Sequence, residues 1–435
     1  MQRRHLGCPG VMSTLTSVGV AIGKFYPYHR GHNLLVQTAR EQCDILAVIV
    51  CQKQGDALTG EQRADWIKWA VDNDYRSTVK AKVLASSPSV AKVEKCHTSI
   101  LPPVLPPSPL TASSAVAQVA SSHSKRTPRR AQVKVIVTKD DIPNTSEAWA
   151  ARTLQLLRDN QLKCPPDKVF TSESYGEAYA NLMGSRHIFL NSRLAEGRKI
   201  RADLATHWED LLPPAKAYFA KRVVVLGVES SGTTTLARAL AKHYQTVWVP
   251  EYGRYYWEGR QHTPNATQWS EWEFVNIARA QQRWEDEMAM SANRVLICDT
   301  DALTTCVWHW RYRQSISEAV ERVADAREYA LYVLTAPSFA FVQDGTRELE
   351  HDQPLRQRMH DHFREHLRRK KKRWVEVTGD LTTRMQTVTP LIDSLLKFDS
   401  LPYVSSPEDK MDNNTGAQEK LNSVASEVAS ASSTV

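Results

Sequence analysis

The chain of 435 residues carries 56 Lys and Arg against 48 Asp and Glu, a formal net charge of +8, and its mean hydropathy is −0.44. A single core seldom exceeds about 250–300 residues, so this length predicts two or three domains, and no apolar run approaches the roughly 18 residues that a membrane helix needs. The seven cysteines form no C-x-x-C pair, so we expect reduced thiols in the cytoplasm rather than a disulfide scaffold.

Most of the positive charge lies in one stretch of unusual composition, residues 80–131. It holds eight Lys and Arg against Glu94 alone, together with seven prolines among Ser, Ala and Val. Such a segment cannot bury enough apolar surface to offset its chain entropy, so we predict a disordered insertion here and a disordered tail at 398–435. We interpret the insertion as a tolerated surface loop, with an arm for nucleic acid or a protein partner as the alternative. Since the remaining domains are close to neutral, nucleic acid is not an expected partner.

In the first half of the chain, short apolar runs alternate with helical patterns. Strands are expected at Val18–Gly23, Ile45–Cys51, Val133–Thr138, Val169–Ser172 and His187–Leu190. Helices are expected at His32–Gln42, Glu61–Asp72, Ser146–Asn160 and Leu204–Phe219. Repeated strand–helix alternation predicts a parallel sheet covered on both faces, here a doubly wound α/β domain over residues 18–212.

A second series of the same kind predicts another doubly wound α/β domain over residues 221–397. Its expected strands are Arg222–Gly227, Val247–Val249, Arg294–Cys298, Ala330–Leu334 and Trp374–Val377. Its expected helices are Thr234–His243, Trp269–Met290, Pro354–Lys370 and Leu381–Lys397. The basic run Arg368–Arg373 ends one of these helices, so we interpret it as a solvated helix end and not as a nucleic-acid patch.

The first expected strand runs directly into a glycine- and histidine-rich turn, after which a helix begins. The turn reads Gly23-Lys-Phe-Tyr-Pro-Tyr-His29-Arg-Gly31-His32. Ligands of open α/β sheets bind at the carboxyl ends of strands, and a helix N-terminus favours phosphate. Gly31 lets the backbone approach a ligand closely, and the two imidazoles can donate hydrogen bonds to phosphate oxygens. The pattern therefore predicts a phosphate site.

This string resembles the H-x-G-H signature of the nucleotidyltransferase superfamily, which has a Rossmann-like fold. The resemblance implies transfer of a nucleotidyl group from ATP to a phosphate-bearing substrate, with release of pyrophosphate and usually with Mg²⁺. It implies that His29 and His32 stabilise the transition-state phosphate, and that Gly23 and Phe25 border the nucleotide. Such catalysis depends on positioning and on charge neutralisation, without a covalent nucleophile.

Four further strings are similar to the NadR-type bifunctional proteins of NAD biosynthesis. They are Gly60-Glu-Gln-Arg63, Asp140–Asn144, Thr171–Gly176 and Arg201–Trp208. The resemblance covers about residues 18–77 and 132–395. It implies that the first domain is a nicotinamide mononucleotide (NMN) adenylyltransferase, in which the NMN phosphate attacks the α-phosphate of ATP to give NAD and pyrophosphate.

One stretch departs from that family, whose I-S-x-T-x-x-R-like string holds the triphosphate tail. Here the stretch is Ala195-Glu-Gly-Arg-Lys-Ile-Arg201, in which only Arg201 matches the polar positions. Arg198 offers replacement positive charge, whereas Glu196 places a carboxylate where a hydroxyl should meet phosphate. At a few ångströms this repulsion costs on the order of 1 kcal/mol unless the side chain turns away.

A second phosphate-binding pattern, a P-loop, follows the first strand of the second domain. Gly227-Val-Glu-Ser-Ser-Gly232-Thr233-Thr234-Thr235 matches the spacing of G-x-x-x-x-G-K-[ST], with Thr233 in place of the Lys. Thr234 stands where the Mg²⁺-coordinating hydroxyl belongs. Since losing one transition-state electrostatic contact commonly costs ~10²–10³ in rate, we expect impaired kinase activity. The alternative is a loop that only binds nucleotide or only packs as a turn.

The surroundings of this loop resemble the ribosylnicotinamide kinase half of NadR, a P-loop NTPase-like domain. An apolar strand ends in Asp299 and Asp301, as a Walker-B strand does to bind Mg²⁺. The resemblance implies that Glu251 holds or deprotonates the ribose 5′-hydroxyl and that Arg347 reaches the transferring phosphate from a lid. The implied reaction makes NMN from nicotinamide riboside and ATP. One of the seven tryptophans between 248 and 310 could stack on the nicotinamide ring, but the sequence does not say which.

Three hypotheses about function follow. The first is a NadR-like enzyme of NAD salvage that uses Mg²⁺, ATP, NMN and nicotinamide riboside and that could form a homo-oligomer. The second is a regulatory protein that senses nucleotide or NAD through degenerate sites. The third is a nucleotidyltransferase with another substrate. Because the H-x-G-H strand starts near residue 18, we expect no N-terminal helix-turn-helix of the kind that some NadR proteins use as repressors.

Overall fold

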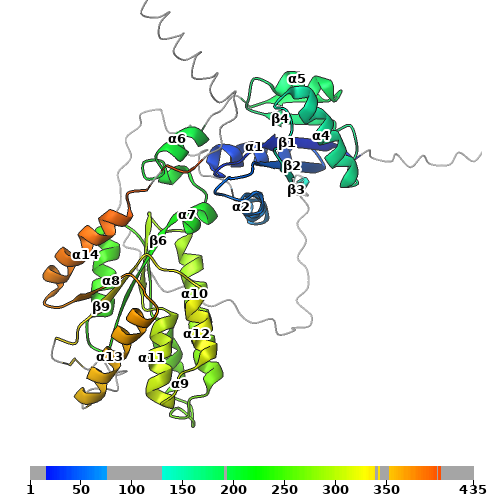
Figure 1. Ribbon diagram of the computed structural model, residues 1–435. Coiled ribbons are helices and arrows are strands. Elements are labelled where there is room, and N and C mark those ends of the chain that lie inside the picture. The colour runs from blue at the N-terminus through cyan, green and yellow to red at the C-terminus, as the bar shows by residue number, and fades with distance from the viewer. Residues whose placement is uncertain are drawn as a thin grey trace, which may run out of the picture.

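The computed structural model describes residues 16–75, 130–190, 194–338, 341–342, 352–398 and 400–402. Over these residues the chain forms two five-stranded parallel sheets, each with helices packed against it (Figure 1). This confirms the expected fold class of two doubly wound α/β units. Most of the insertion predicted at 80–131 and most of the tail predicted at 398–435 lie outside the described residues.

The first sheet has the strand order β3-β2-β1-β4-β5. Its strands are β1 (Val18–Gly23), β2 (Ile45–Gln52), β3 (Gln132–Lys139), β4 (Lys168–Thr171) and β5 (Arg186–Phe189). Its helices are α1 (Arg30–Arg40), α2 (Gly60–Asp72), α4 (Ser146–Asp159), α5 (Gly176–Leu182), α6 (Gly197–Ala202) and α7 (Pro213–Phe219), with the 3₁₀ helix η1 (Trp208–Asp210) before α7. The strand order reverses between β1 and β4, and the carboxyl ends at such a switch point are where open α/β sheets bind ligands.

The second sheet has the strand order β10-β9-β6-β8-β7. Its strands are β6 (Lys221–Gly227), β7 (Trp248–Val249), β8 (Val295–Asp299), β9 (Leu331–Thr335) and β10 (Trp374–Val377). Its helices are α8 (Thr233–His243), α9 (Tyr252–Arg260), α10 (Glu271–Ala289), α11 (Ala302–Arg313), α12 (Glu318–Asp325), α13 (Gln353–Arg369) and α14 (Leu381–Leu395). The P-loop follows the central strand β6, and Asp299 ends the neighbouring strand β8.

The helix expected over Leu204–Phe219 is wrong as a continuous element. The chain forms η1, passes through Leu211 and Leu212 in non-helical conformation, and begins α7 at Pro213. A proline lacks the N–H that a helix interior requires and is tolerated in the first turn, so Pro213 and Pro214 make a new helix start here.

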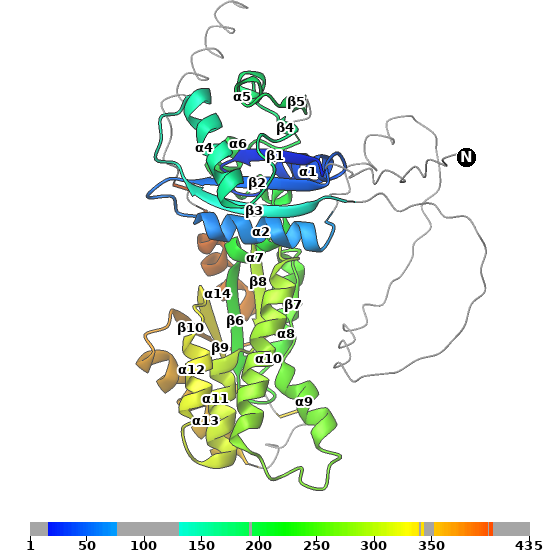
Figure 2. The same ribbon diagram turned by 90° about the vertical axis from the view of Figure 1, so that its right-hand side faces the viewer.

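A continuous apolar core joins the two units. In Figure 2, α7 lies between α2 of the first unit and the second sheet. The ring of Trp66 on α2 meets the rings of Tyr218 and Phe219 on α7 at centroid distances of 5.8 and 6.2 Å. Trp208 is buried, and its indole Nε1 donates to the carbonyl oxygen of Ala292 at 2.8 Å. The first domain is therefore fixed to the second through η1 and α7.

Two sequence-based expectations about environment are addressed by the described residues. None of the described helices is long and apolar enough to cross a membrane. The cysteines in this part of the chain, at 43, 51, 164, 298 and 306, are all free thiols.

Candidate active sites

His29 links the turn after β1 to the start of α1. It is the N-cap residue of that helix, and its Nδ1 accepts hydrogen bonds from the backbone N–H groups of Gly31 and His32 at 3.1 and 3.4 Å. Burial, together with the nearby His32 and Arg201, lowers the pKa of His29 well below its usual range. A neutral ring whose Nδ1 accepts must carry its proton on Nε2, so Nε2 is a hydrogen-bond donor. A Cβ on Gly197 would lie 3.5 Å from this Nε2, so the donor faces the first residue of α6.

His32 stacks on His29 and completes an aromatic cluster. The two imidazoles lie 3.7 Å apart between centroids, and Phe25 meets His32 edge-on at 5.1 Å. Desolvation in this cluster is the main cause that lowers the pKa of His32 to about 3, so the ring is neutral near pH 7. Its Nδ1 is buried and has no hydrogen-bond partner within the described part of the chain. An unpaired buried ring nitrogen is costly, which favours a ligand atom at this position.

Arg201 and two glycines close the first site. Nη1 of Arg201 donates to the carbonyl oxygen of Tyr26 at 2.8 Å, which places its charge beside both histidines. A Cβ on Gly31 would lie 3.0 Å from the His29 ring and 3.2 Å from the Ala195 carbonyl oxygen, so a larger residue would crowd the turn. A Cβ on Gly23 would lie 3.7 Å from the Phe25 ring, an ordinary van der Waals distance, so Gly23 borders this ring without being crowded by it. The structure thus brings together His29, His32, Gly23, Phe25, Gly31 and Arg201.

Glu196 does not stand alone beside this site. Its carboxylate pairs with the Lys199 ammonium at 3.0 Å, and both side chains are largely exposed. The local charge that we expected to repel a triphosphate is therefore balanced by a lysine one turn along α6, which weakens the expected repulsion.

Two contacts that support the first site could not be found from sequence patterns. The guanidinium of Arg63 is fully buried, donates to the carbonyl oxygens of Lys24 and Cys51, and pairs with Asp56 at 3.2 Å. It ties the ends of β1 and β2 together below the histidines, which gives the Gly60–Arg63 string a structural role.

The second contact comes from residues 398 and 400–402, which we call the C-terminal strap. The Tyr26 hydroxyl donates to the Pro402 carbonyl oxygen at 2.7 Å, and the Leu401 N–H donates to the Arg201 carbonyl oxygen at 2.9 Å. The Phe398 ring packs on Trp208 at 5.9 Å between centroids. The sequence assigned these residues to a disordered tail, whereas the strap packs on the first site.

The P-loop adopts the conformation that its glycines permit. Gly232 has φ +86° and Ser230 has φ +59°, and α8 begins at Thr233. Gly227 needs its lack of a side chain, because a Cβ would lie 2.3 Å from Thr335 Oγ1. The loop walls a cavity of about 490 Å³ that Gly227, Gly232, Thr233, Thr234 and Thr235 line together with Glu251, Arg254 and Thr300. Consecutive N–H groups around such a turn form an anion-binding nest.

The two acids after β8 have different environments. Thr234 Oγ1 donates to Asp299 Oδ2 at 2.5 Å, whereas Asp299 Oδ1 is buried with no partner among the described residues. Burial raises the pKa of Asp299 to about 6. An orphaned carboxylate oxygen beside a threonine hydroxyl fits the hard oxygen ligands that Mg²⁺ takes in P-loop proteins.

Asp301 has its oxygens occupied by protein groups. It caps α11, since its Oδ1 accepts from the Thr304 N–H at 3.1 Å, and its Oδ2 accepts from the Tyr332 hydroxyl at 3.1 Å. Thr300 between the two acids has φ +72°, a turn that separates their directions. Asp299 is therefore the better candidate of the two for a metal ligand. The described residues contain no group of three His, Cys, Asp or Glu side chains that could hold a metal by themselves.

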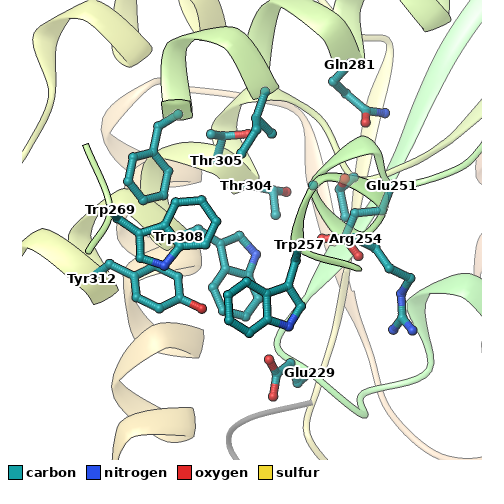
Figure 3. A pocket seen from close by; sticks show the side chains of 14 residues that line it. Glu229, Glu251, Arg254, Trp257, Trp269, Gln281, Thr304, Thr305, Trp308 and Tyr312 are labelled. Carbon is teal, nitrogen blue, oxygen red and sulfur yellow. The ribbon is translucent and has the colours of Figure 1, made fainter. Parts of the chain in front are cut away.

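A larger aromatic cavity of about 750 Å³ adjoins the P-loop cavity. Figure 3 shows Trp257, Trp269, Trp308 and Tyr312 around it, with Glu251 and Arg254 at the right and Glu229 below the rings. Trp257 and Trp269 lie 5.9 Å apart between centroids at 25°, and Trp308 and Tyr312 lie 6.1 Å apart at 23°. Parallel rings of this kind suit a flat aromatic ligand. Of the seven tryptophans between 248 and 310, the structure places Trp257, Trp269 and Trp308 at this cavity.

Glu251 lines both cavities, at the end of β7 and the start of α9. This is the placement expected of a group that contacts a hydroxyl next to phosphate. Arg347 lies outside the described residues, so its expected role stays a prediction. Of the basic run at 368–373, Arg369 and Lys370 pair with Glu321 on α12 at 2.6 and 2.8 Å, and Lys372 pairs with Glu328 at 3.2 Å.

Known proteins share this architecture. A family model described as an AAA domain matches residues 222–384, within the second unit. The "Trifunctional NAD biosynthesis/regulator protein NadR" of Escherichia coli strain K12 is 25% identical over 339 residues, 77% of this chain and 72% of that protein. This chain is homologous to NadR. NadR of Salmonella typhimurium strain LT2 is 23% identical with the same coverage.

Two solved NadR structures align over 90% of this chain and 99% of their own. The structure in complex with NR has a TM-score of 0.59 at 18% identity, and the structure in complex with NAD and AMP-PNP has a TM-score of 0.57 at 17% identity. The likeness shows that the NadR fold extends over both units of this chain.

Proposed function

We propose that this NadR homologue makes NAD from NMN and ATP at the first site, and that its second site phosphorylates nicotinamide riboside to NMN. The observation that carries the first activity is the neutral histidine pair at the N-terminus of α1, with an unpartnered buried nitrogen on His32. The homology to NadR supports the substrates, since the solved relatives hold NAD, an ATP analogue and NR. The proposal places both reactions in the cytoplasm, in keeping with the free thiols of the five cysteines that the structure describes.

At the first site, the chain acts by position and charge. A phosphate oxygen of NMN attacks the α-phosphorus of ATP, the bond to the bridging oxygen breaks, and pyrophosphate leaves. Nε2–H of His29 donates to an α-phosphate oxygen as its negative charge grows, the ring of His32 stacks on His29 and holds it in place, and Arg201 neutralises the leaving pyrophosphate. Neutral imidazoles donate without desolvating a buried charge, and preorganised donors of this kind account for a large share of such rate enhancements.

At the second site, the aromatic cavity holds the nicotinamide ring and directs the ribose 5′-hydroxyl toward Glu251. Glu251 accepts the hydroxyl proton while the oxygen attacks the γ-phosphorus and ADP leaves. Asp299 and Thr234 would hold Mg²⁺, which supplies charge neutralisation on the β- and γ-phosphates.

The test of the first activity is formation of NAD from NMN and MgATP, followed by chromatography. We expect His32→Asn to lower the rate about 10²–10³-fold, because loss of the ring stacked on His29 displaces the preorganised donor. His262→Ala is the matched control, because His262 is exposed on the second unit and its loss should leave the rate unchanged. Wild-type protein that forms no more NAD than the His32 variant would refute the proposal.

A second candidate function, nucleotide sensing at the second site, is favoured by one observation: Thr233 replaces the P-loop lysine. Formation of NMN from nicotinamide riboside and MgATP separates the two functions. A kinase loses this activity in Glu251→Gln, whereas a sensor binds nucleotide without turnover in both proteins.

A further inference from the structure

The P-loop cavity lacks the lysine of its pattern, yet a triphosphate requires a cation there. Among the described residues that line this cavity, Arg254 is the one Lys or Arg. It lies in the first turn of α9, three residues after Glu251. The residues that line both cavities are Glu229, Glu251, Arg254, Thr300 and Trp308. Arg254 therefore lies at the junction of the two cavities, where a ribose hydroxyl in the aromatic cavity would meet the phosphates of ATP on the P-loop. Figure 3 shows the Arg254 side chain on the side of Glu251 away from the tryptophans.

Other arginines near the loop have different positions. Arg356 donates to the carbonyl oxygens of Glu229 and Ser230 at 3.0 and 3.2 Å, and Arg384 donates to those of Ser231 and Ala336. Both are buried and bind carbonyl groups of the loop, so they hold its shape and do not line the cavity. Arg238 is exposed on α8 and lies over the Trp248 ring at 4.7 Å.

We propose that Arg254 takes the place of the absent P-loop lysine, so that its guanidinium binds the β- and γ-phosphates of ATP at the junction of the two cavities. This inference rests on the proposed function of the second site. A guanidinium presents a planar pair of donors that matches two phosphate oxygens, and its charge persists at any physiological pH. Arg254 takes no part in covalent chemistry: the γ-phosphoryl group passes from ATP to the 5′-oxygen, ADP leaves, and the hydroxyl proton goes to Glu251.

The experiment measures five proteins: wild type, Arg254→Ala, Thr233→Lys, the double variant and the control Arg238→Ala. Binding of MgAMP-PNP is followed through quenching of tryptophan fluorescence, and the change that Arg254→Ala causes in this signal reports the second site, because Arg254 and Trp308 both line its phosphate cavity. Formation of NMN from nicotinamide riboside gives kcat and KM for ATP. Formation of NAD at the first site confirms that each variant is folded.

We expect Arg254→Ala to weaken MgAMP-PNP binding about tenfold and to lower NMN formation about 10²-fold, in the range for loss of one phosphate contact. Thr233→Lys should raise NMN formation at least about tenfold in the Arg254→Ala background. It should raise NMN formation by less in wild type, because the introduced lysine and Arg254 would bind the same phosphates. Arg238→Ala, a matched loss of one arginine near Asp299, should leave both measurements unchanged.

The possible results separate the inference from the proposed function. Unchanged nucleotide binding in Arg254→Ala, or a gain from Thr233→Lys that is equal in both backgrounds, overturns the role of Arg254. Binding that depends on Arg254 without NMN formation in wild type keeps that role and overturns the kinase. A wild type that binds no MgAMP-PNP at this site overturns both.

Discussion

His29 and His32 show how burial sets the chemical form of a catalytic group. Both rings have pKa values far below that of a free histidine, chiefly because the folded chain desolvates them. The neutral His29 ring can donate its Nε2 proton to phosphate while its Nδ1 accepts from the backbone N–H groups of Gly31 and His32. The same desolvation makes the folded state sensitive to acid, since the unfolded chain can bind protons that the folded chain excludes.

This linkage gives a pH prediction for His32. Its folded pKa of about 3 lies below the unfolded value of about 6.5, so stability is fully present above pH 6.5 and is lost as the pH falls toward 3. At pH 5 the loss from this ring is about 1–2 kcal/mol, a few degrees in melting temperature for a domain of this size. We expect the midpoint of wild type to fall relative to His32→Asn between pH 7.5 and pH 5, measured by differential scanning calorimetry. If the difference in melting midpoint between wild type and His32→Asn does not change with pH, that result contradicts a neutral buried His32.

Residues that act through contiguous motifs could be predicted from the sequence, and residues that act through the fold could not. The histidine turn and the P-loop each occupy ten residues or fewer, so their spacing alone indicates a phosphate site. Trp257 and Arg254 lie on α9 and Trp308 lies on α11, and the two helices meet only when β7 and β8 pair, so no local pattern marks these residues. Asp299 and Asp301 stand at the end of the same apolar strand, so the sequence does not distinguish them as metal ligands. The positive φ of Thr300 between them gives their side chains different environments.

At the scale of elements, the strands were predictable because central parallel strands are continuous apolar runs. β1, β2 and β6 lie within a residue of their predicted bounds. The helices α5, α6, α9, α11 and α12 were not predicted. In α11, apolar and aromatic residues occur on all faces because the helix packs among α10, α12 and α13, so it has no amphipathic period. In α9, Gly253 and Gly259 and four aromatic residues oppose a helical prediction.

The C-terminal strap provides a prediction at this scale. It follows α14 of the second unit and bonds to Tyr26 and to the backbone of Arg201 in the first site. Removing it should loosen Arg201, so a chain ended after Lys397 is expected to form NAD about tenfold more slowly, or about 1.4 kcal/mol in the barrier, with a raised KM for ATP. A chain ended after Pro402 is the matched control and should keep the rate of the full chain. Equal rates for both truncations would contradict a positioning role for the strap.

At the scale of the whole molecule, the two units share one core, and this could not be read from the sequence. The apolar cluster that contains Phe25 and Trp66 of the first unit continues through Trp208 and Phe219 to residues of the second sheet. Trp208 and Ala292 are 84 residues apart in the chain. The location of charge, by contrast, could be read directly: most of the net +8 lies in the predicted insertion and not in the catalytic units.

The shared core predicts how the molecule unfolds. Trp208→Ala removes a buried indole and its hydrogen bond to the Ala292 carbonyl, a change that costs about 3–5 kcal/mol when the site cannot collapse. Because the indole joins the two units, we expect one calorimetric transition in wild type and, in the variant, an earlier separate transition of the first domain.

Trp272→Ala is the control, because it makes the same substitution at a residue that is 62% exposed, and it should leave the unfolding profile unchanged. Trp208→Phe keeps most of the apolar contact and loses the N–H donor, so its midpoint should lie between those of wild type and Trp208→Ala. A Trp208→Ala protein that unfolds in one transition at the wild-type temperature would show that the units are held together elsewhere.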